Sequence, residues 1–445
     1  MIDVLKHPVY ARLFTAQVIA LLGTGLLTVA LGLLAFDLAG DKAGAVLGTA
    51  YAIKMIAYVG LAPIAAAIVD RLPRKAVLIG ADLLRASVAV FLPFIDSVWQ
   101  IYVLIFVLQA ASATFTPTFQ AVIPDILSDE KDYTKALSLS RLAYDLENLI
   151  SPALAGILLT IMSYHWLFGG TVAGFIASAA LVAVTIIPAP DLQKKPRPFL
   201  ERLTRGTRIY LATPRLRGLL ALNFAAAAAG AFVLVNTVVI VRAGYGATET
   251  HVAYALAAFG GGSMLAALTL PRLLETISDR VLMVAAAFGL AGLTLGHALY
   301  VLSEGLAAWG AFLFAWAVSG VFYSAILTPS GRLLRHSAHA QDRSAIFVAQ
   351  FALSHACWLL TYPIAGWAGQ AFGLPVAMAI LGILAFAGAF VALFIWPADD
   401  AKELLHEHPD LPPDHPHLQE YQAQGKHHRH VFVIDDEHRA WPTHG

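Results

Sequence analysis

The stretch VDRLPRKAVLIGADLLRA, residues 69–86, decides the fold class, because it joins two long apolar runs through a short charged loop. The runs cover residues 45–69 and 76–95. Each holds about the 20 residues that an α-helix needs to cross a hydrocarbon core roughly 30 Å thick. The loop carries one acidic and three basic side chains, Asp70, Arg71, Arg74 and Lys75. We therefore predict two neighbouring membrane-spanning helices joined by a basic loop.

The same pattern recurs along most of the chain. Further apolar runs lie at residues 10–35, 98–123, 133–162, 166–187, 216–241, 250–274, 281–302, 307–333, 344–368 and 374–396. Only helices and closed barrels satisfy every backbone polar group in lipid, and runs of this length are helices. Hydrophobic residues make up 58% of the chain and charged residues only 13%, against about a quarter in soluble domains. We predict an all-α membrane protein with twelve transmembrane helices.

The basic side chains indicate how these helices are oriented. Lys and Arg gather in cytoplasmic loops. If the N-terminus is cytoplasmic, the outer loops hold only Lys42 and Arg242. Both termini are then expected inside a bacterial-type cytoplasmic membrane. The first run is too long for a cleaved signal peptide, so we expect an uncleaved span. The net charge of zero gives no basic field for nucleic acid.

A polar stretch in the middle of the chain divides the spans into six and six. We expect an N-terminal bundle over 1–188, a cytoplasmic linker over 189–215 and a C-terminal bundle over 216–396, as in transporters built from repeats. The tail, 397–445, is rich in Pro, Asp, Glu and His, a composition typical of disorder. A trace of the repeat survives in NLISPALAG of the fifth span and LLTYPIAG of the eleventh.

The loop at 70–75 resembles a signature of the major facilitator superfamily, G-x-L-A-D-R-x-G-R-K. Asp70, Arg71, Arg74 and Lys75 match it, whereas Ala66 and Pro73 stand where the family has glycine. The resemblance implies two six-helix bundles and a secondary transporter.

The same resemblance implies a cytoplasmic latch. Asp70 would face the start of the eleventh helix, where an anion is favoured. Arg71 and Arg74 would reach carboxylates such as Asp125. Ordinary positive-inside charge explains the basic residues without a latch, but it does not explain an Asp-Arg pair directly after a span.

Two segments, residues 69–86 and the sequence FTPTFQAVIPDIL, are similar to the drug, macrolide and siderophore exporter branch of the superfamily. In the fifth span, Pro152 and Gly156 are similar to the antiporter motif of exporters, and Ser151 replaces its glycine. In the fourth span, Phe106 stands three residues before Gln109, where the family usually has arginine. The usual proton-coupling arginine is therefore not matched.

Four ionisable side chains lie near the middle of predicted spans: Lys54, Asp145, Glu147 and His355. Each costs at least roughly 2.5–3.5 kcal/mol at a helix centre, so such a group usually has a partner and a function. Tyr51 and Tyr58 share a helical face with Lys54. Neutral ligands could come from four amides, Gln109, Gln120, Asn148 and Gln350.

Two interpretations of these groups stay open. A Lys54–Asp145 or Arg141–Asp145 pair could fix helix packing, because buried charges must have partners. Alternatively, the groups line a central cavity, where Asp145 or Glu147 alternates between Lys54, a proton and the cargo. His355 could then titrate near neutral pH.

Histidine is concentrated in the tail, with His406, His408, His415, His417, His427, His428, His430, His438 and His444. Imidazole is a good ligand for Ni²⁺, Co²⁺, Zn²⁺ and Cu²⁺. With AYAIKMIAYVGLAP and HACWLLTYPIAGW, this tail makes the chain similar to the nickel-resistance permeases of the superfamily. A solvated tail without a metal site is the alternative, because no ligand spacing recurs.

The sequence predicts a secondary active exporter, coupled to protons, whose cargo is nickel or cobalt. Candidate metal ligands are Asp145, His355 and the tail histidines. Lys54 would repel a metal ion, so an exporter of an organic solute (a drug, siderophore or metal chelate) is the first alternative. A metal sensor without transport is the second. No GxxxxGK[ST] loop is present, which disfavours an ATP-driven pump. We expect no enzymatic activity, no cofactor and a monomer.

Overall fold

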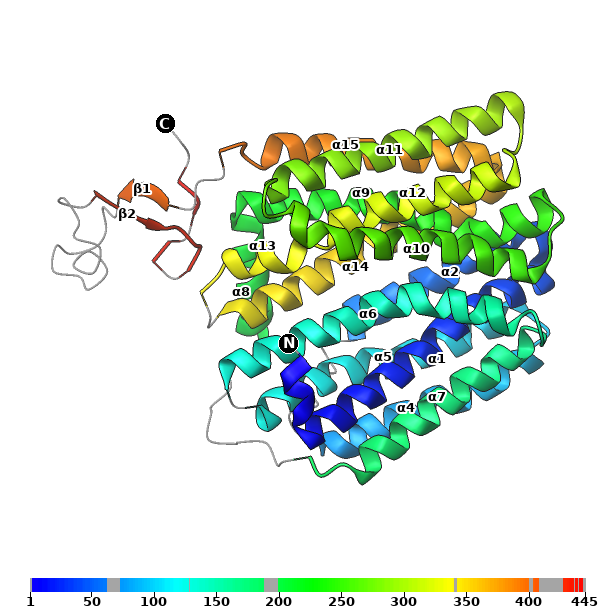
Figure 1. The fold of residues 1–445 in the computed structure, drawn as a ribbon, viewed down its shortest axis with the longest axis horizontal. Coiled ribbons are helices and arrows are strands. Elements are labelled where there is room, and N and C mark those ends of the chain that lie inside the picture. The colour runs from blue at the N-terminus through cyan, green and yellow to red at the C-terminus, as the bar shows by residue number, and fades with distance from the viewer. Residues whose placement is uncertain are drawn as a thin grey trace.

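Long helices running side by side make up most of the molecule (Figure 1). The computed structural model describes residues 2–61, 73–127, 129–187, 199–339, 342–399, 403–407, 427–435, 437–438 and 440–442. Both termini lie at one end of the helices, which we call the terminal end, and the opposite end is called the far end (Figure 1).

Six long helices form the N-terminal bundle: α1 (Pro8–Ala39), α2 (Ala43–Ile56), α4 (Arg74–Phe91), α5 (Val98–Ile126), α6 (Glu130–Leu158) and α7 (His165–Val184). A π-helical segment, Ala57–Leu61, continues α2. Within the bundle α1 packs on α7, where the Thr171 hydroxyl donates to the Gly23 carbonyl oxygen at 2.8 Å.

Six more form the C-terminal bundle: α9 (Pro214–Val239), α10 (Glu249–Leu273), α11 (Asp279–Glu304), α12 (Trp309–Leu327), α14 (Arg343–Phe372) and α15 (Leu374–Ile395). The alanine-rich α9 is buried along almost its whole length, because small side chains let α11, α12, α14 and α15 pack around it.

Among the described residues these twelve helices confirm the predicted fold class. Ten stretches are long and apolar enough to cross a membrane. One of them, Pro8–Leu61, contains both α1 and α2. Helix α6 is not among the ten, since Arg141, Asp145 and Glu147 lie in its apolar half. Helix α6 therefore has more charged residues in its apolar part than the ten stretches do.

The two bundles pack together near the far end, where α2 begins and α14 ends. A Cβ on Gly48 would lie 2.6 Å from the Tyr362 carbonyl oxygen, and one on Gly366 would lie 2.3 Å from that of Gly44. The Trp367 indole also donates to the Thr49 hydroxyl at 3.1 Å. Only glycine permits so close an approach of the two backbones.

Helix α8 (Phe199–Ala212) lies within the predicted linker, 189–215, and packs on the start of α14. Arg205 donates to Asp342 through two nitrogens, Nε to Oδ1 at 2.6 Å and Nη2 to Oδ2 at 2.9 Å, and the side chains are 9% and 3% exposed. Tyr210 donates to Gln350 Oε1 at 2.5 Å. The described part of the linker is therefore fixed to the C-terminal bundle.

Part of the tail is ordered, which differs from the disorder that its composition predicts. β1 (Glu403–Glu407) pairs with β2 (His427–Val431) in an antiparallel hairpin. The short apolar run Phe432, Val433 and Ile434 that follows is buried, and the Arg215 guanidinium lies 5.4 Å from the Trp441 ring centroid. The amino-acid composition of the whole tail is polar, so it gives no sign of these three apolar residues. Their burial against the rest of the protein stabilises the ordered part of the tail.

Asp435 attaches this segment to the connection between α13 (Ser330–His336) and α14. Its Oδ2 lies 3.3 Å from His339 Nε2, and its Oδ1 accepts from the backbone and ring of His438 at 2.7 and 2.9 Å. Burial alone would raise the pKa of Asp435, but the hydrogen bonds from His438 outweigh it and hold the pKa well below its usual range.

Replacing Asp435 with asparagine is expected to loosen the tail. A lowered carboxyl pKa means that the stabilisation is complete above the ordinary value of 3.8 and is lost only as the pH falls through the folded value. At neutral pH the loss of hydrogen bonds to a charged acceptor is about 2 kcal/mol, so proteolysis of the tail should rise at least tenfold. Asp399→Asn, at an exposed site before the hairpin, is the control. Equal cleavage rates in the two variants would contradict this role of Asp435.

Candidate transport site

Two facing stripes of side chains join the bundles through α2 and α14. The α2 stripe is Tyr51, Lys54 and Tyr58, and the α14 stripe is Phe351, His355, Trp358 and Tyr362. Spacings of three and four residues place each set on one helical face. We call the two stripes together the aromatic seam.

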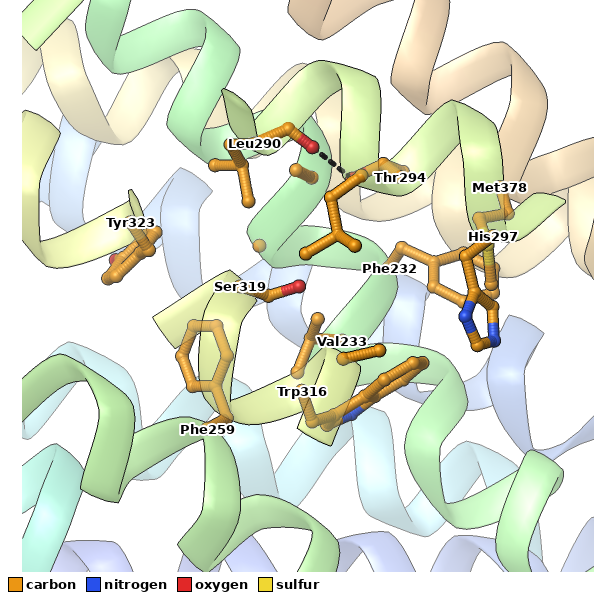
Figure 2. A pocket seen from close by; sticks show the side chains of 14 residues that line it. Phe232, Val233, Phe259, Leu290, Thr294, His297, Trp316, Ser319, Tyr323 and Met378 are labelled. Atoms are coloured by element: carbon orange, nitrogen blue, oxygen red, sulfur yellow. Dashed lines mark hydrogen bonds between the residues drawn. The ribbon is translucent and has the colours of Figure 1, made fainter. Parts of the chain in front are cut away.

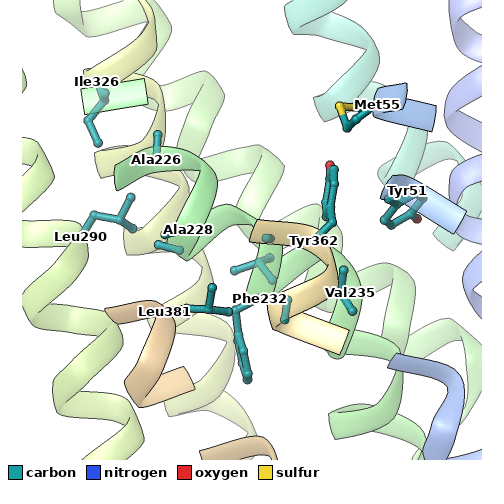
Figure 3. Packing of buried hydrophobic residues seen from close by; sticks show 14 of the residues in the cluster. Tyr51, Met55, Ala226, Ala228, Phe232, Val235, Leu290, Ile326, Tyr362 and Leu381 are labelled. Atoms are coloured by element: carbon teal, nitrogen blue, oxygen red, sulfur yellow. The ribbon is translucent and has the colours of Figure 1, made fainter. Parts of the chain in front are cut away.

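Ring contacts across the seam connect the two halves of the chain. The centroids of Tyr51 and Tyr362 are 5.0 Å apart, and Tyr58 lies 5.3 Å from His355 and 5.7 Å from Phe351. Figure 3 shows Tyr362 pointing from α14 toward Tyr51 and Met55 of α2. Tilted and edge-on pairs at these distances are favourable, so the seam presents an aromatic wall with one cation in it.

That cation, Lys54, has a carboxylate near it. Its Nζ lies 5.8 Å from the Tyr58 ring centroid, and it attracts Glu147 of α6 electrostatically. Glu147 packs on α1, with its Cγ 3.5 Å from where Gly25 would carry a Cβ. From the sequence, Asp145 and Glu147 of α6 were the candidate partners of Lys54, with an Arg141–Asp145 pair as the alternative. The structure brings Lys54 near Glu147, whereas the side chains of Asp145 and Asn148 lie outside the described residues.

His355 occupies the matching place on α14. Its Nδ1 lies 2.6 Å from the Phe351 carbonyl oxygen. Because that oxygen can only accept, Nδ1 carries the hydrogen of the neutral ring and Nε2 is the nitrogen that can take up a proton. Gln109 of α5 is buried inside the N-terminal bundle, and none of its described contacts joins it to Lys54.

The sequence did not lead us to predict a buried charge pair within the N-terminal bundle. Asp82 and Arg85 of α4 form an ion pair and are 0% and 5% exposed. Ser178 of α7 donates to Asp82 Oδ2 at 2.7 Å, and the Arg85 guanidinium lies 4.4 Å from the ring centroids of both Phe115 and Phe175.

The signal for this pair was in the sequence. An acid and an arginine three residues apart in an apolar run share a helical face and can satisfy each other. Arg85 also attracts Glu147 electrostatically. Within the N-terminal bundle, two cations, Lys54 and Arg85, therefore both attract the carboxylate of Glu147.

The latch and the tail ligands stay predictions. Asp70 and Arg71 lie outside the described residues, as does the side chain of Asp125, while Arg74 is the first residue of α4. Of the tail histidines, His408, His415, His417 and His444 lie outside the described residues, as do the side chains of His406, His427 and His428. His430 packs on His438, with ring centroids 5.1 Å apart.

No metal centre is formed by the described residues. They contain no group of three or more His, Cys, Asp or Glu placed to hold a metal ion. Among the predicted ligands, His355 has ring contacts with Tyr58 and Phe351, which are not metal ligands of the predicted set.

Two bundles of long apolar helices that meet across an aromatic seam with one cation in it define a polytopic membrane protein of the transporter kind. Residues 13–308 and 219–427 match the Major Facilitator Superfamily, and the chain belongs to that family. This confirms the resemblance at the level of the superfamily, and it confirms the prediction that the chain is a transporter and not an enzyme.

Similar proteins add detail. The chain is 25% identical over 330 residues to the uncharacterized MFS-type transporter YfiS of Bacillus subtilis, covering 73% of this chain and 78% of YfiS. It is also 25% identical over 304 residues to macrolide efflux protein A of Streptococcus pyogenes, covering 65% and 73%.

The fold is similar to that of the nucleoside transporter NupG. The TM-score is 0.68 at 12% identity, with 87% of this chain and 100% of NupG covered. At this identity the likeness shows the fold alone.

Proposed function

We propose that this transporter exports an organic solute with a large apolar body, in exchange for protons. The aromatic seam between the bundles, with Lys54 and Glu147 beside it, carries this proposal. Ligand sites for organic molecules are mostly apolar and aromatic, with a few placed polar groups. The relation to macrolide efflux protein A supports a drug-like cargo and export as the direction.

Glu147 is the proposed proton carrier. It has a cation partner in Lys54 and lies on a helix that packs against α1 within its own bundle and against α10 of the other. A carboxylate that gains a proton releases Lys54, and one that loses it restores the attraction. The cargo and the proton would thus compete for the same charge, which couples their movements in opposite directions.

Alternating access requires the seam to open. The bundles are packed at the far end, so cargo would enter from the terminal end, and export would follow when α2 separates from α14. We place the terminal end in the cytoplasm, because the basic loops predict that side. The working unit would be a single chain in the cytoplasmic membrane.

Export of nickel or cobalt is the second candidate, favoured by the nine histidines of the tail. Three observations weigh against it. Lys54 would repel a divalent ion within the seam, the described residues hold no metal-binding cluster, and none of the relatives named above is named for nickel. A metal sensor has the same weakness.

A single experiment separates these candidates. A host lacking its own drug exporters would carry empty vector, the full chain, or Lys54→Ala. We expect the full chain to lower accumulated erythromycin several-fold and to leave cell-associated nickel and cobalt, measured by mass spectrometry, unchanged. Lys54→Ala should lose the effect. Lowered nickel with unchanged erythromycin would contradict the proposal and restore the metal exporter.

A further inference from the structure

A small cavity opens beside the aromatic seam, inside the C-terminal bundle. It has a volume of about 20 Å³ and lies among α9, α10, α11, α12 and α15. Tyr323 lines it and has its ring centroid 6.3 Å from that of Trp358 in the seam. Gly230 also lines it, and a Cβ there would lie 2.8 Å from the Trp358 ring. The cavity is therefore a neighbour of the proposed cargo site.

Its walls are apolar except for one polar side. Thr294 and His297 of α11 face Ser319 of α12, and Figure 2 shows Thr294 and Ser319 pointing into the space from their two helices. Thr294 donates to the Leu290 carbonyl oxygen at 2.8 Å, which leaves its oxygen able to accept. The indole of Trp316 donates to Thr237 at 2.8 Å and is fixed in the wall.

Among the described residues, Ser319 is one of several span hydroxyl groups without a hydrogen bond, together with Ser151 and Thr361, and of these three it is the one that lines the cavity. Thr24, Thr114 and Thr294 return their hydrogens to the carbonyl four residues earlier. Ser319 is only 7% exposed and makes no hydrogen bond within the described part of the chain. A buried hydroxyl without a partner costs free energy, and in a membrane bundle little solvent reaches it. The geometry calls for a polar atom in the cavity.

The size of the cavity limits what that atom can belong to. About 20 Å³ accommodates one water-sized group with several polar partners. A hydroxyl group meets the need, since it can donate to Thr294 or His297 and accept from Ser319. A charged group would lack a counter-charge among the lining residues.

We propose that this cavity is a side arm of the cargo site that takes a hydroxyl group carried on an apolar or aromatic arm of the cargo. This rests on the proposed function and adds to it the substrate class: a neutral hydroxyl tip, held by Ser319 between α11 and α12. The same oxygen chemistry could be supplied by a buried water, and the experiment distinguishes the two sources.

The test measures binding rather than transport. The full chain in lipid nanodiscs would be titrated with benzyl alcohol and with toluene, which have similar shapes and differ in the hydroxyl. The signal is the fluorescence of Trp316, obtained by subtracting Trp316→Phe and empty nanodiscs. We expect benzyl alcohol to bind about fivefold more tightly than toluene, the worth of one hydrogen bond. Ser319→Ala should remove this preference, and Ser303→Ala, at an exposed end of α11, should retain it.

The binding test can fail or succeed independently of the proposed export function. If Ser319→Ala keeps the preference, or if neither probe changes the Trp316 signal, the cavity holds only structural water and the proposal is wrong. If the preference depends on Ser319 while erythromycin export fails in cells, the side arm stands and the cargo must be another hydroxylated solute.

Discussion

Replacing Glu147 with glutamine is expected to lower the rate of proton-driven export by at least about a hundredfold. Glutamine keeps the size of the side chain but can neither bind nor release a proton. It also leaves Lys54 without the carboxylate that attracts it. The rate would be measured as erythromycin uptake into inverted vesicles energised with a proton gradient. Glu304→Gln, an exposed carboxylate at the end of α11, is the matched control and should keep the wild-type rate.

Energy-independent exchange provides a second readout of the same variant. Exchange of labelled for unlabelled erythromycin needs cargo movement but no net proton movement, so Glu147→Gln should retain much of it. If net export by Glu147→Gln equals that of the control, another group carries the proton. Asp145 would then be the first residue to examine, because it is the other acidic residue in the apolar half of the same helix.

Replacing Gly366 with valine is expected to abolish transport by holding the bundles apart at the far end. A Cβ at Gly366 would lie 2.3 Å from the Gly44 carbonyl oxygen, a distance at which backbone must move. Because α2 and α14 carry the two stripes of the seam, their separation at this crossing also separates Tyr51 from Tyr362. We expect efflux to fall below detection while the protein still inserts in the membrane.

The change in conformation can be measured directly. Spin labels at Lys42→Cys and Thr248→Cys, both exposed at the far end, would report the separation of the bundles in a Cys357→Ser background. The Gly366→Val distribution should shift to longer distances. Gly296→Val is the control, since a Cβ there meets nothing within 4 Å. A wild-type distribution for Gly366→Val would show that the crossing tolerates a side chain and that this account of far-end closure is wrong.

The helices could be predicted from sequence because lipid imposes one rule on all of them. Apolar runs long enough to span a bilayer located every long helix, and α15 (Leu374–Ile395) lies within one residue of the predicted run. The boundaries were less certain where polar residues continue a helix beyond the apolar region. The predicted run at 133–162 corresponds to α6 at Glu130–Leu158.

The site was predictable only in part. Periodicity alone put Tyr51, Lys54 and Tyr58 on one face of α2, and depth in the span singled out Glu147 and His355. Their juxtaposition depends on which helices become neighbours. The contact of α2 with α14 is made by residues about three hundred positions apart, and no local pattern encodes it.

The order in part of the tail could not be predicted from its composition. Composition is an average, and a segment rich in charged and polar residues is expected to stay disordered. The docked part is short: Phe432 and Ile434 are buried, and Asp435 anchors them to the α13–α14 connection. This contact depends on His339, which lies far from Asp435 in the sequence, so the sequence of the tail alone does not predict it.

In the proposed mechanism Glu147 exchanges a proton for cargo. The most direct test follows proton movement in proteoliposomes that contain a pH-sensitive dye and a preformed pH gradient. Adding erythromycin should dissipate the gradient with the wild-type chain and with Glu304→Gln, but not with Glu147→Gln. A proton flux that is the same in Glu147→Gln and the wild type, or no flux from a wild-type chain that moves erythromycin, would contradict the account.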